Sequence, residues 1–237
     1  METTIRRSAI PAGNLRILLA DSHSVPSHGT SRSAGSSVQV DSALSRALTA
    51  AALEIYLGRK PSSEELSGEM RIPGEKPWFP AHPDFCYNIS HSGGIAVCGL
   101  SDHPIGIDIQ KVTKNTKQIL RIAKRFFSAE EQESLQELQD TNEPAAICRL
   151  FCRYWTARES YIKLIGRGLA EPFANFRPDL DAGVIHALRS HCTDSTGPLS
   201  EDTFYLTECP APEGFCLTVC STVPLPTCTP EEIFDHS

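Results

Sequence analysis

The stretch HPIGIDIQK, His103 to Lys111, alternates apolar and polar residues in a way that predicts a strand carrying a carboxylate. Isoleucines occupy every second position, and Gly106, Asp108 and Gln110 stand between them. Because successive side chains of a strand point to opposite faces, we expect the isoleucines in the core and the other three together on the second face. There Gly106 would leave space for a bulky ligand beside Asp108. A structural cap or edge residue is the alternative interpretation of a lone strand aspartate.

A second carboxylate lies in a long helical pattern that spans residues 143–166. Trp155, Glu159 and Lys163 are each four residues apart, so they lie on one helical face. The simplest interpretation is an exposed ion pair between Glu159 and Lys163. The tryptophan on the same stripe indicates instead that this face packs against other residues, where charged groups need partners.

Asp108 and Glu159 together offer two hard oxygen ligands on rigid elements, and Gln110 offers a third, directly or through water. Magnesium favours one or two carboxylates, completed by waters and by the phosphates of a substrate. The two segments therefore predict a magnesium site that handles a phosphorylated compound.

Groups suited to binding phosphate occur in two further segments. In NISHSG, Asn88 to Gly93, His91 stands between Ser90 and a second serine near a strand end. In GEKP, Lys76 lies in an extended segment where its point charge can meet a phosphate. Polar turn residues without a ligand are the alternative for NISHSG. With Lys163, these residues indicate chemistry on a polyphosphorylated substrate, whose identity the pattern leaves open.

Composition limits the class of protein. The chain has 237 residues and a formal net charge of -7, which argues against general affinity for nucleic acid or for anionic membranes. No apolar run approaches the ~20 residues that span a bilayer, so we expect a cytoplasmic protein. Nine cysteines without a C-x-x-C pair are expected to be reduced and mostly buried.

The periodic segments predict a mixed α/β (α+β) protein with a helix-plus-sheet set in each half. We expect domains at 1–102 and 103–237, the second carrying most metal and catalytic residues. Residues 21–42 are rich in Ser and Gly and are expected to be flexible, with Asp41 and Ser42 capping the next helix. Ser128 is expected to cap another helix with Glu131 in a capping box. The predicted helices are 43–58, 117–127, 128–139 and 143–166; the predicted strands are 85–90, 95–100, 104–109, 183–188, 203–208 and 215–220.

The motifs GEKPWFP, YNISHSG, PIGIDIQ, FFSAEEQESL and WTARESYIKLIGRGL occur in an order that resembles the phosphopantetheinyl transferase superfamily. The likeness is greatest to its broad-specificity, surfactin-synthetase-activating branch and covers roughly residues 43–180. The resemblance implies a pseudo-twofold fold of two similar helix-plus-antiparallel-sheet halves in one chain, acting as a monomer.

It also implies the reaction. Coenzyme A donates its phosphopantetheine arm to a serine of an apo acyl or peptidyl carrier protein, and adenosine 3′,5′-bisphosphate is released. The residues then take implied roles: Asp108, Gln110 and Glu159 hold Mg²⁺, Lys163 faces the pyrophosphate, Lys76, Ser90 and His91 lie near the 3′-phosphate, and Glu159 or Glu131 accepts the serine proton. The basic residues of 117–127 are a candidate surface for docking an acidic carrier; a solvated basic face above an apolar stripe that faces the core is the alternative.

The sequence departs from the family pattern in three places. Gln110 stands where many relatives have Glu, Arg158 replaces a lysine, and the basic N-terminal stretch of relatives has no clear match beyond candidates such as Arg46. Two other functions stay open: a non-catalytic relative that binds coenzyme A or a carrier, and a metal-dependent phosphohydrolase that uses water in place of serine.

Overall fold

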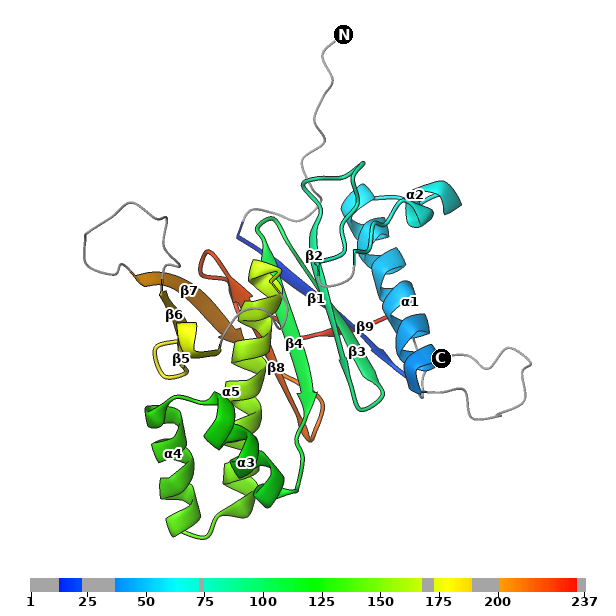
Figure 1. Ribbon diagram of the computed structural model, residues 1–237. Coiled ribbons are helices and arrows are strands. Elements are labelled where there is room, and N and C mark those ends of the chain that lie inside the picture. The colour runs from blue at the N-terminus through cyan, green and yellow to red at the C-terminus, as the bar shows by residue number, and fades with distance from the viewer. Residues whose placement is uncertain (1–12, 23–36, 73–74, 168–172, 189–200, 234–237) are drawn as a thin grey trace.

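The computed structural model describes residues 13–22, 37–72, 75–167, 173–188 and 201–233, and its helices and mainly antiparallel strands confirm the α+β class (Figure 1). The helices are α1 (Ser37–Leu57), α2 (Ser63–Ser67), α3 (Thr116–Phe126), α4 (Ala129–Asp140) and α5 (Pro144–Ile165), with a short 3₁₀ turn η2 (Phe173–Asn175). The strands are β1 (Leu15–Asp21), β2 (Cys86–Ser92), β3 (Ile95–Ser101), β4 (Ile105–Lys111), β5 (Phe176–Asp179), β6 (Val184–Leu188), β7 (Glu201–Glu208), β8 (Phe215–Ser221) and β9 (Glu231–Glu232).

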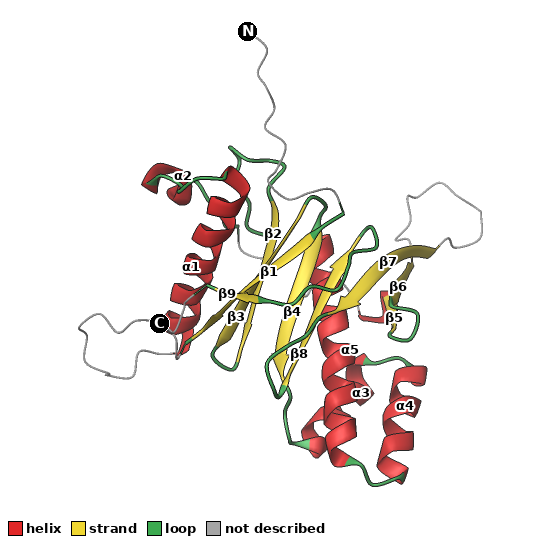
Figure 2. Cartoon of the chain, turned by 180° about the vertical axis from the view of Figure 1, so that it is seen from behind, coloured by secondary structure: helices red, strands yellow, loops and turns green. Residues whose placement is uncertain are grey.

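The strands form two sheets that lie side by side in the middle of the molecule (Figure 2). The first has the order β2-β3-β1-β9, and the second has the order β4-β8-β7-β6-β5 with every pair antiparallel. Helix α1 packs on the first sheet and α5 on the second. This arrangement is compatible with two similar halves. Strand β9 pairs with β1 although it comes from the C-terminal end, and the domain division between residues 102 and 103 stays a prediction.

The alternating isoleucines of β4 enter the core between the two sheets, as expected. Ile105, Ile107 and Ile109 are buried there with Ile17 of β1 and Val97 of β3. A separate core lies under α1, and another joins α3 and α4 to α5. The face of β4 that carries Asp108 is therefore directed away from the central core, toward α5.

Most predicted elements form. The strands predicted at 85–90, 95–100 and 104–109 are β2, β3 and β4, and the three C-terminal strands are β6, β7 and β8. The hairpin of β2 and β3 turns at Gly93 and Gly94, whose positive φ angles of 57° and 88° suit a two-residue hairpin turn. Ser128 and Glu131 form the expected capping box, and α5 ends at Gly166 in the left-handed conformation.

Two expectations at the N-terminal side were wrong. Helix α1 begins at Ser37, so Asp41 and Ser42 lie inside the helix and do not cap it, and residues 37–42 are helical rather than a flexible loop. At the other end of that predicted loop, Asp21 belongs to β1 and Ser22 to a turn, while residues 23–36 lie outside the described residues. The segment Leu15–Asp21 forms β1, a strand that the sequence pattern did not indicate because its apolar residues do not alternate strictly.

Strands β2 and β4 run along each other where the two sheets meet, but side chains of β2 take the place of backbone partners. The amide nitrogens of β4 donate to side-chain oxygens of β2: Ile107 to Asn88 Oδ1 at 2.9 Å, Ile109 to Ser90 Oγ at 3.2 Å and Lys111 to Ser92 Oγ at 3.0 Å. We call this set the β2–β4 seam. Each pair is separated by 19 residues, so the two strands run parallel and in register. The seam satisfies an edge of β4 that would otherwise expose its backbone groups.

Removing an acceptor from the buried part of the seam should destabilise the fold. Asn88→Ala leaves the buried amide of Ile107 without a partner, which typically costs about 1–3 kcal/mol. Ser92→Ala is the matched control, because its bond lies at the exposed end of the seam where water replaces it, and we expect a loss below about 1 kcal/mol. Urea unfolding of both variants measures the difference; equal stabilities would show that the seam contributes nothing specific.

Gly106 does not clear room for a ligand, in contrast to the expectation from sequence. A Cβ atom added at this position would lie 2.0 Å from the carbonyl oxygen of Ser160 and 2.4 Å from the amide nitrogen of Leu164. Both are backbone atoms of α5. Gly106 is thus the point at which helix α5 approaches strand β4 most closely, and this contact sets the position of Glu159 and Lys163 over the strand.

Gly106→Ala should therefore lower the free energy of unfolding by about 1–3 kcal/mol or more, because a backbone cannot move aside as a side chain does. Gly99→Ala in β3 is the control, since its added Cβ would meet only the side-chain ends of Ile105 and Ile107, the nearest at 2.9 Å. Denaturant titration should rank Gly106→Ala as clearly less stable. A stable Gly106→Ala protein with weakened ligand binding would instead restore the idea that Gly106 faces a ligand.

Candidate active site

Asp108 of β4 lies at the centre of the residues that the sequence singled out. Its side chain is buried, with 6% of the residue exposed. Oδ1 accepts hydrogen bonds from Ser90 Oγ at 2.8 Å and from Lys163 Nζ at 2.7 Å. Oδ2 is buried and has no hydrogen-bond partner in the described part of the chain. A buried carboxylate oxygen without a partner is costly, so this atom is a natural ligand for a cation.

Lys163 on α5 is held by three acceptors. Its Nζ donates to Asp108 Oδ1, to Ser90 Oγ at 2.8 Å and to the carbonyl oxygen of Ile107 at 3.0 Å. An ammonium group has three donors, and all three are used here. Lys163 thus joins α5 to both strands of the seam, and its charge lies directly beside Asp108.

Glu159 lies one turn before Lys163 and is half-buried. Burial raises the pKa of its carboxyl above the ordinary value, and the negative charge of Asp108 raises it further, while Lys163 opposes both effects. The effect of Asp108 on Glu159 indicates that the two carboxylates are close enough to repel each other. A divalent cation between them would remove the repulsion and would give Oδ2 of Asp108 a partner.

The donor set fits magnesium better than a metal that needs an all-protein cage. In the described ranges no group of three or more His, Cys, Asp or Glu side chains is placed to hold an ion. Two carboxylates leave the remaining positions to water and to substrate phosphates, as magnesium prefers. The expected third ligand, Gln110, has its amide directed to the carbonyl oxygen of Lys111 at 3.4 Å, at the edge of a pocket.

Lys76 also reaches β4. Its Nζ donates to the carbonyl oxygen of Ile105 at 2.5 Å, and burial lowers its pKa to about 8. Lys76 and Lys163 therefore bind carbonyls two residues apart on one strand, a separation of roughly 6–7 Å along β4. The two lysines line the same edge of β4, beside the seam.

The other predicted phosphate-binding residues are divided between the two faces of β2. Ser90 is buried in the seam, where its hydroxyl binds Asp108 and Lys163, so it does not lie on an exposed surface. His91 points to the other face, half-exposed, with Nδ1 3.5 Å from Asp41 Oδ2 of α1. Arg46, also on α1, is exposed and donates to Ser42 Oγ at 2.8 Å. His91 and Arg46 are thus associated with α1, apart from the cluster around Asp108.

Glu131 is committed to a buried ion pair and does not join the cluster. Arg158 donates from Nε to Glu131 Oε1 at 3.0 Å and from its NH2 group to Oε2, which also accepts from the amide of Ser128 at 2.7 Å. Arg158 is fully buried and is surrounded by the rings of Phe127, Phe173 and Phe176. A carboxylate held in this way anchors α4 to α5 and is poorly placed to accept a substrate proton.

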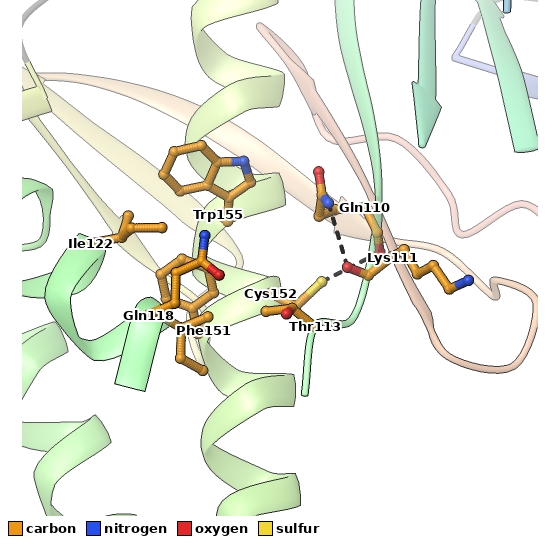
Figure 3. A pocket seen from close by; sticks show the side chains of 9 residues that line it. Gln110, Lys111, Thr113, Gln118, Ile122, Phe151, Cys152 and Trp155 are labelled. Atoms are coloured by element: carbon orange, nitrogen blue, oxygen red, sulfur yellow. Dashed lines mark hydrogen bonds between the residues drawn. The ribbon is translucent and has the colours of Figure 1, made fainter. Parts of the chain in front are cut away.

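A pocket of about 260 Å³ lies next to the cluster, between the end of β4, helix α3 and helix α5 (Figure 3). It is lined by Gln110, Lys111, Thr113, Gln118, Ile119, Ile122, Phe151, Cys152 and Trp155. Gln110 is two residues from Asp108, and Trp155 is one turn before Glu159. The two elements that carry the carboxylates, β4 and α5, therefore also form two walls of the pocket.

The sequence pattern missed the role of Asn88 and the tie between Ser90 and Asp108. A signal was present: in NISHS the polar residues Asn88, Ser90 and Ser92 occupy every second position of a strand whose other residues include Ile89. This alternation places three acceptors on one face. The pattern could not show which element contacts that face, because β2 and β4 belong to different sheets.

Comparison with known proteins points to one family. Residues 104–220 match the model of the 4′-phosphopantetheinyl transferase superfamily. The chain is 44% identical over 101 residues to a 4′-phosphopantetheinyl transferase of Bacillus subtilis, and 37% identical over 152 residues to the 4′-phosphopantetheinyl transferase Sfp of B. subtilis strain 168. These matches cover 43% and 63% of this chain, and 42% and 60% of those proteins. The chain thus spans about half the length of the curated relatives it matches.

A more distant match is the L-aminoadipate-semialdehyde dehydrogenase-phosphopantetheinyl transferase of Xenopus laevis, 33% identical over 93 residues, which are 37% of this chain and 30% of that protein. The matched family region, 104–220, includes Asp108, Glu159 and Lys163. The part of the chain that carries the candidate site is therefore similar to the 4′-phosphopantetheinyl transferase superfamily, and the chain resembles members of the Sfp type.

Proposed function

We propose that this protein transfers the 4′-phosphopantetheine arm of coenzyme A to a serine of an apo acyl or peptidyl carrier protein and releases adenosine 3′,5′-bisphosphate. The observation that carries the proposal is the buried Oδ2 of Asp108, which has no hydrogen-bond partner among the described residues. Oδ1 of the same carboxylate binds Lys163, and the charge of Asp108 acts on Glu159. All three residues lie in the segment that is similar to the transferase family.

Mg²⁺ is the metal that the donor set fits, with Asp108 and Glu159 as its protein ligands. When bound, it would neutralise charge on the pyrophosphate as the phosphoanhydride bond breaks. Ser90 orients Asp108 by donating to Oδ1, which leaves Oδ2 for the ion. Lys163 supplies a positive charge at the same place. We do not include Gln110 among the ligands, because its amide lines the neighbouring pocket.

Glu159 is the better candidate for the group that accepts the serine proton. It lies one turn before Lys163 on the helix that packs against Asp108, whereas the oxygens of Glu131 are held by Arg158 and Ser128. Transfer of the proton directly or through a water is compatible with this assignment. Lys76 at the seam and His91 and Arg46 near α1 are proposed to bind the nucleotide end of coenzyme A.

The acceptor is proposed to dock on α3. Lys117, Arg121, Lys124 and Arg125 are all exposed there, and α3 also forms one wall of the pocket beside Asp108. A basic surface of this kind suits an acidic partner, although the enzyme has a formal net charge of -7. In the described residues no helix is both long and apolar enough to cross a bilayer. The cytoplasmic location and the monomeric state stay predictions.

A single incubation distinguishes this function from the two alternatives. The protein is mixed with coenzyme A, Mg²⁺ and an apo carrier protein, and the carrier is weighed by mass spectrometry while the nucleotide products are separated. A carrier that gains one phosphopantetheine supports the transferase. Release of bisphosphate with an unmodified carrier would indicate a phosphohydrolase, and neither product would indicate a binding protein.

Asp108→Ala and Glu159→Ala should each lower the rate of carrier modification by about a hundredfold or more, because one carboxylate alone cannot hold the ion against the pyrophosphate. Glu133→Gln is the matched control, since Glu133 is an exposed carboxylate on α4 and should leave the rate unchanged. Initial rates at fixed magnesium measure the effect. Wild-type rates in either alanine variant would remove that residue from the site.

A further inference from the structure

Cys152 of α5 and Cys216 of β8 face each other where the helix packs on the second sheet. The Cys152 thiol donates to the carbonyl oxygen of Gln110 at 3.4 Å, and Gln110 is the direct partner of Cys216 in the β4–β8 pair. Cys216 Sγ lies 4.0 Å from the carbonyl oxygen of Arg149, one turn before Cys152. Both sulfur atoms therefore lie in the same part of the contact between α5 and the second sheet, beside Gln110.

Cys152 of this pair lies at the wall of a pocket. Cys152 lines the pocket between β4, α3 and α5, and Figure 3 shows its sulfur near Gln110 at the pocket wall. Of the other described cysteines, Cys98 and Cys220 are fully buried and lie outside this pocket. A reagent the size of a hydroperoxide that enters the pocket therefore meets Cys152.

The surroundings favour reaction at this pair. The contact with Cys152 lowers the pKa of the Cys216 thiol, burial opposes this effect, and the guanidinium groups of Arg149 and Arg153 add to the lowering. The same contact and burial raise the pKa of the Cys152 thiol, so Cys216 is the member of the pair that ionises more readily. The thiolate is the reactive form of cysteine. Burial raises the pKa of Cys98 and of Cys220, and neither of these fully buried residues lines the pocket.

From this geometry we infer that Cys152 and Cys216 form an oxidisable dithiol site whose oxidant is a hydroperoxide. One sulfur attacks the peroxide oxygen, so that a sulfenic acid forms and one water leaves. The second sulfur then attacks the sulfenic sulfur, the S–S bond forms, and the hydroxyl leaves with the thiol proton as a second water. Two thiols thus lose two electrons to one molecule of hydrogen peroxide.

The disulfide would change the wall of the pocket. It would covalently join α5 to β8 and remove the S–H group that Cys152 donates to Gln110. Cys152 is seven residues, or about two turns, before Glu159, so the link would lie on the helical face that leads to the candidate site. The inference does not depend on the transferase reaction, because the bond itself is measured.

The test uses the full-length native protein, reduced and then freed of reductant. It is exposed to hydrogen peroxide, its remaining thiols are alkylated, and trypsin with a glutamate-specific protease cuts it for tandem mass spectrometry. We expect a peptide pair that joins residues 150–153 to residues 214–231 through Cys216, and that dithiothreitol separates. The pair should be absent from Cys152→Ser and Cys216→Ser and should persist in Cys228→Ser.

Oxidation in denaturant provides a control that does not require the variants to fold. If the native geometry directs the bond, the Cys152–Cys216 disulfide should be the main disulfide formed in native protein. In unfolded protein it should be only one of many disulfides. The inference is overturned if native protein keeps both thiols, if it gives only sulfinic or sulfonic acids, or if another pair such as Cys209 and Cys228 is the one that forms.

Discussion

One edge of β4 has no backbone partner strand among the described residues, and the hydrogen bonds that satisfy that edge determine the site. Side chains of Asn88, Ser90 and Ser92 accept hydrogen bonds from its amides, while Lys76 and Lys163 donate to its carbonyls. In an ordinary sheet the amides and carbonyls of this edge would bind the backbone of a neighbouring strand, and no side chains would be needed to satisfy them. Here the same requirement for buried hydrogen bonds collects hydroxyl, amide and ammonium groups in a row between two sheets.

The hydrogen bonds and the charge around Asp108 come from this row of side chains. Ser90 and Lys163 bind one of its oxygens, and the close contact of α5 with Gly106 brings the helix that carries Glu159 against the same strand. The result is a carboxylate pair in a partly buried setting, with positive charge on one side and an unsatisfied oxygen on the other. A site of this kind is incomplete in the protein alone and becomes complete with a cation and an anionic substrate.

The sequence predicted the chemistry better than it predicted the geometry. Periods of two and four placed Asp108, Glu159 and Lys163 correctly on β4 and α5, because these periods follow from backbone geometry alone. Gly106 was misinterpreted, since a glycine in a strand gives no sign of whether a ligand or a helix fills the space above it. Glu131 was recognised as a capping residue, but its second partner, Arg158, comes from another helix, and such tertiary pairs are not visible in local patterns.

The central claim is that Asp108 Oδ2 and Glu159 hold a divalent cation together with coenzyme A. Mn²⁺ can replace Mg²⁺ as a paramagnetic probe, and electron paramagnetic resonance measures its free concentration during a titration. We expect the native protein with coenzyme A to bind the ion and Asp108→Asn to lose that binding, because asparagine keeps the acceptor for Ser90 and Lys163 but removes the charge. Equal binding by the native protein and Asp108→Asn, or no binding by either, would contradict the account.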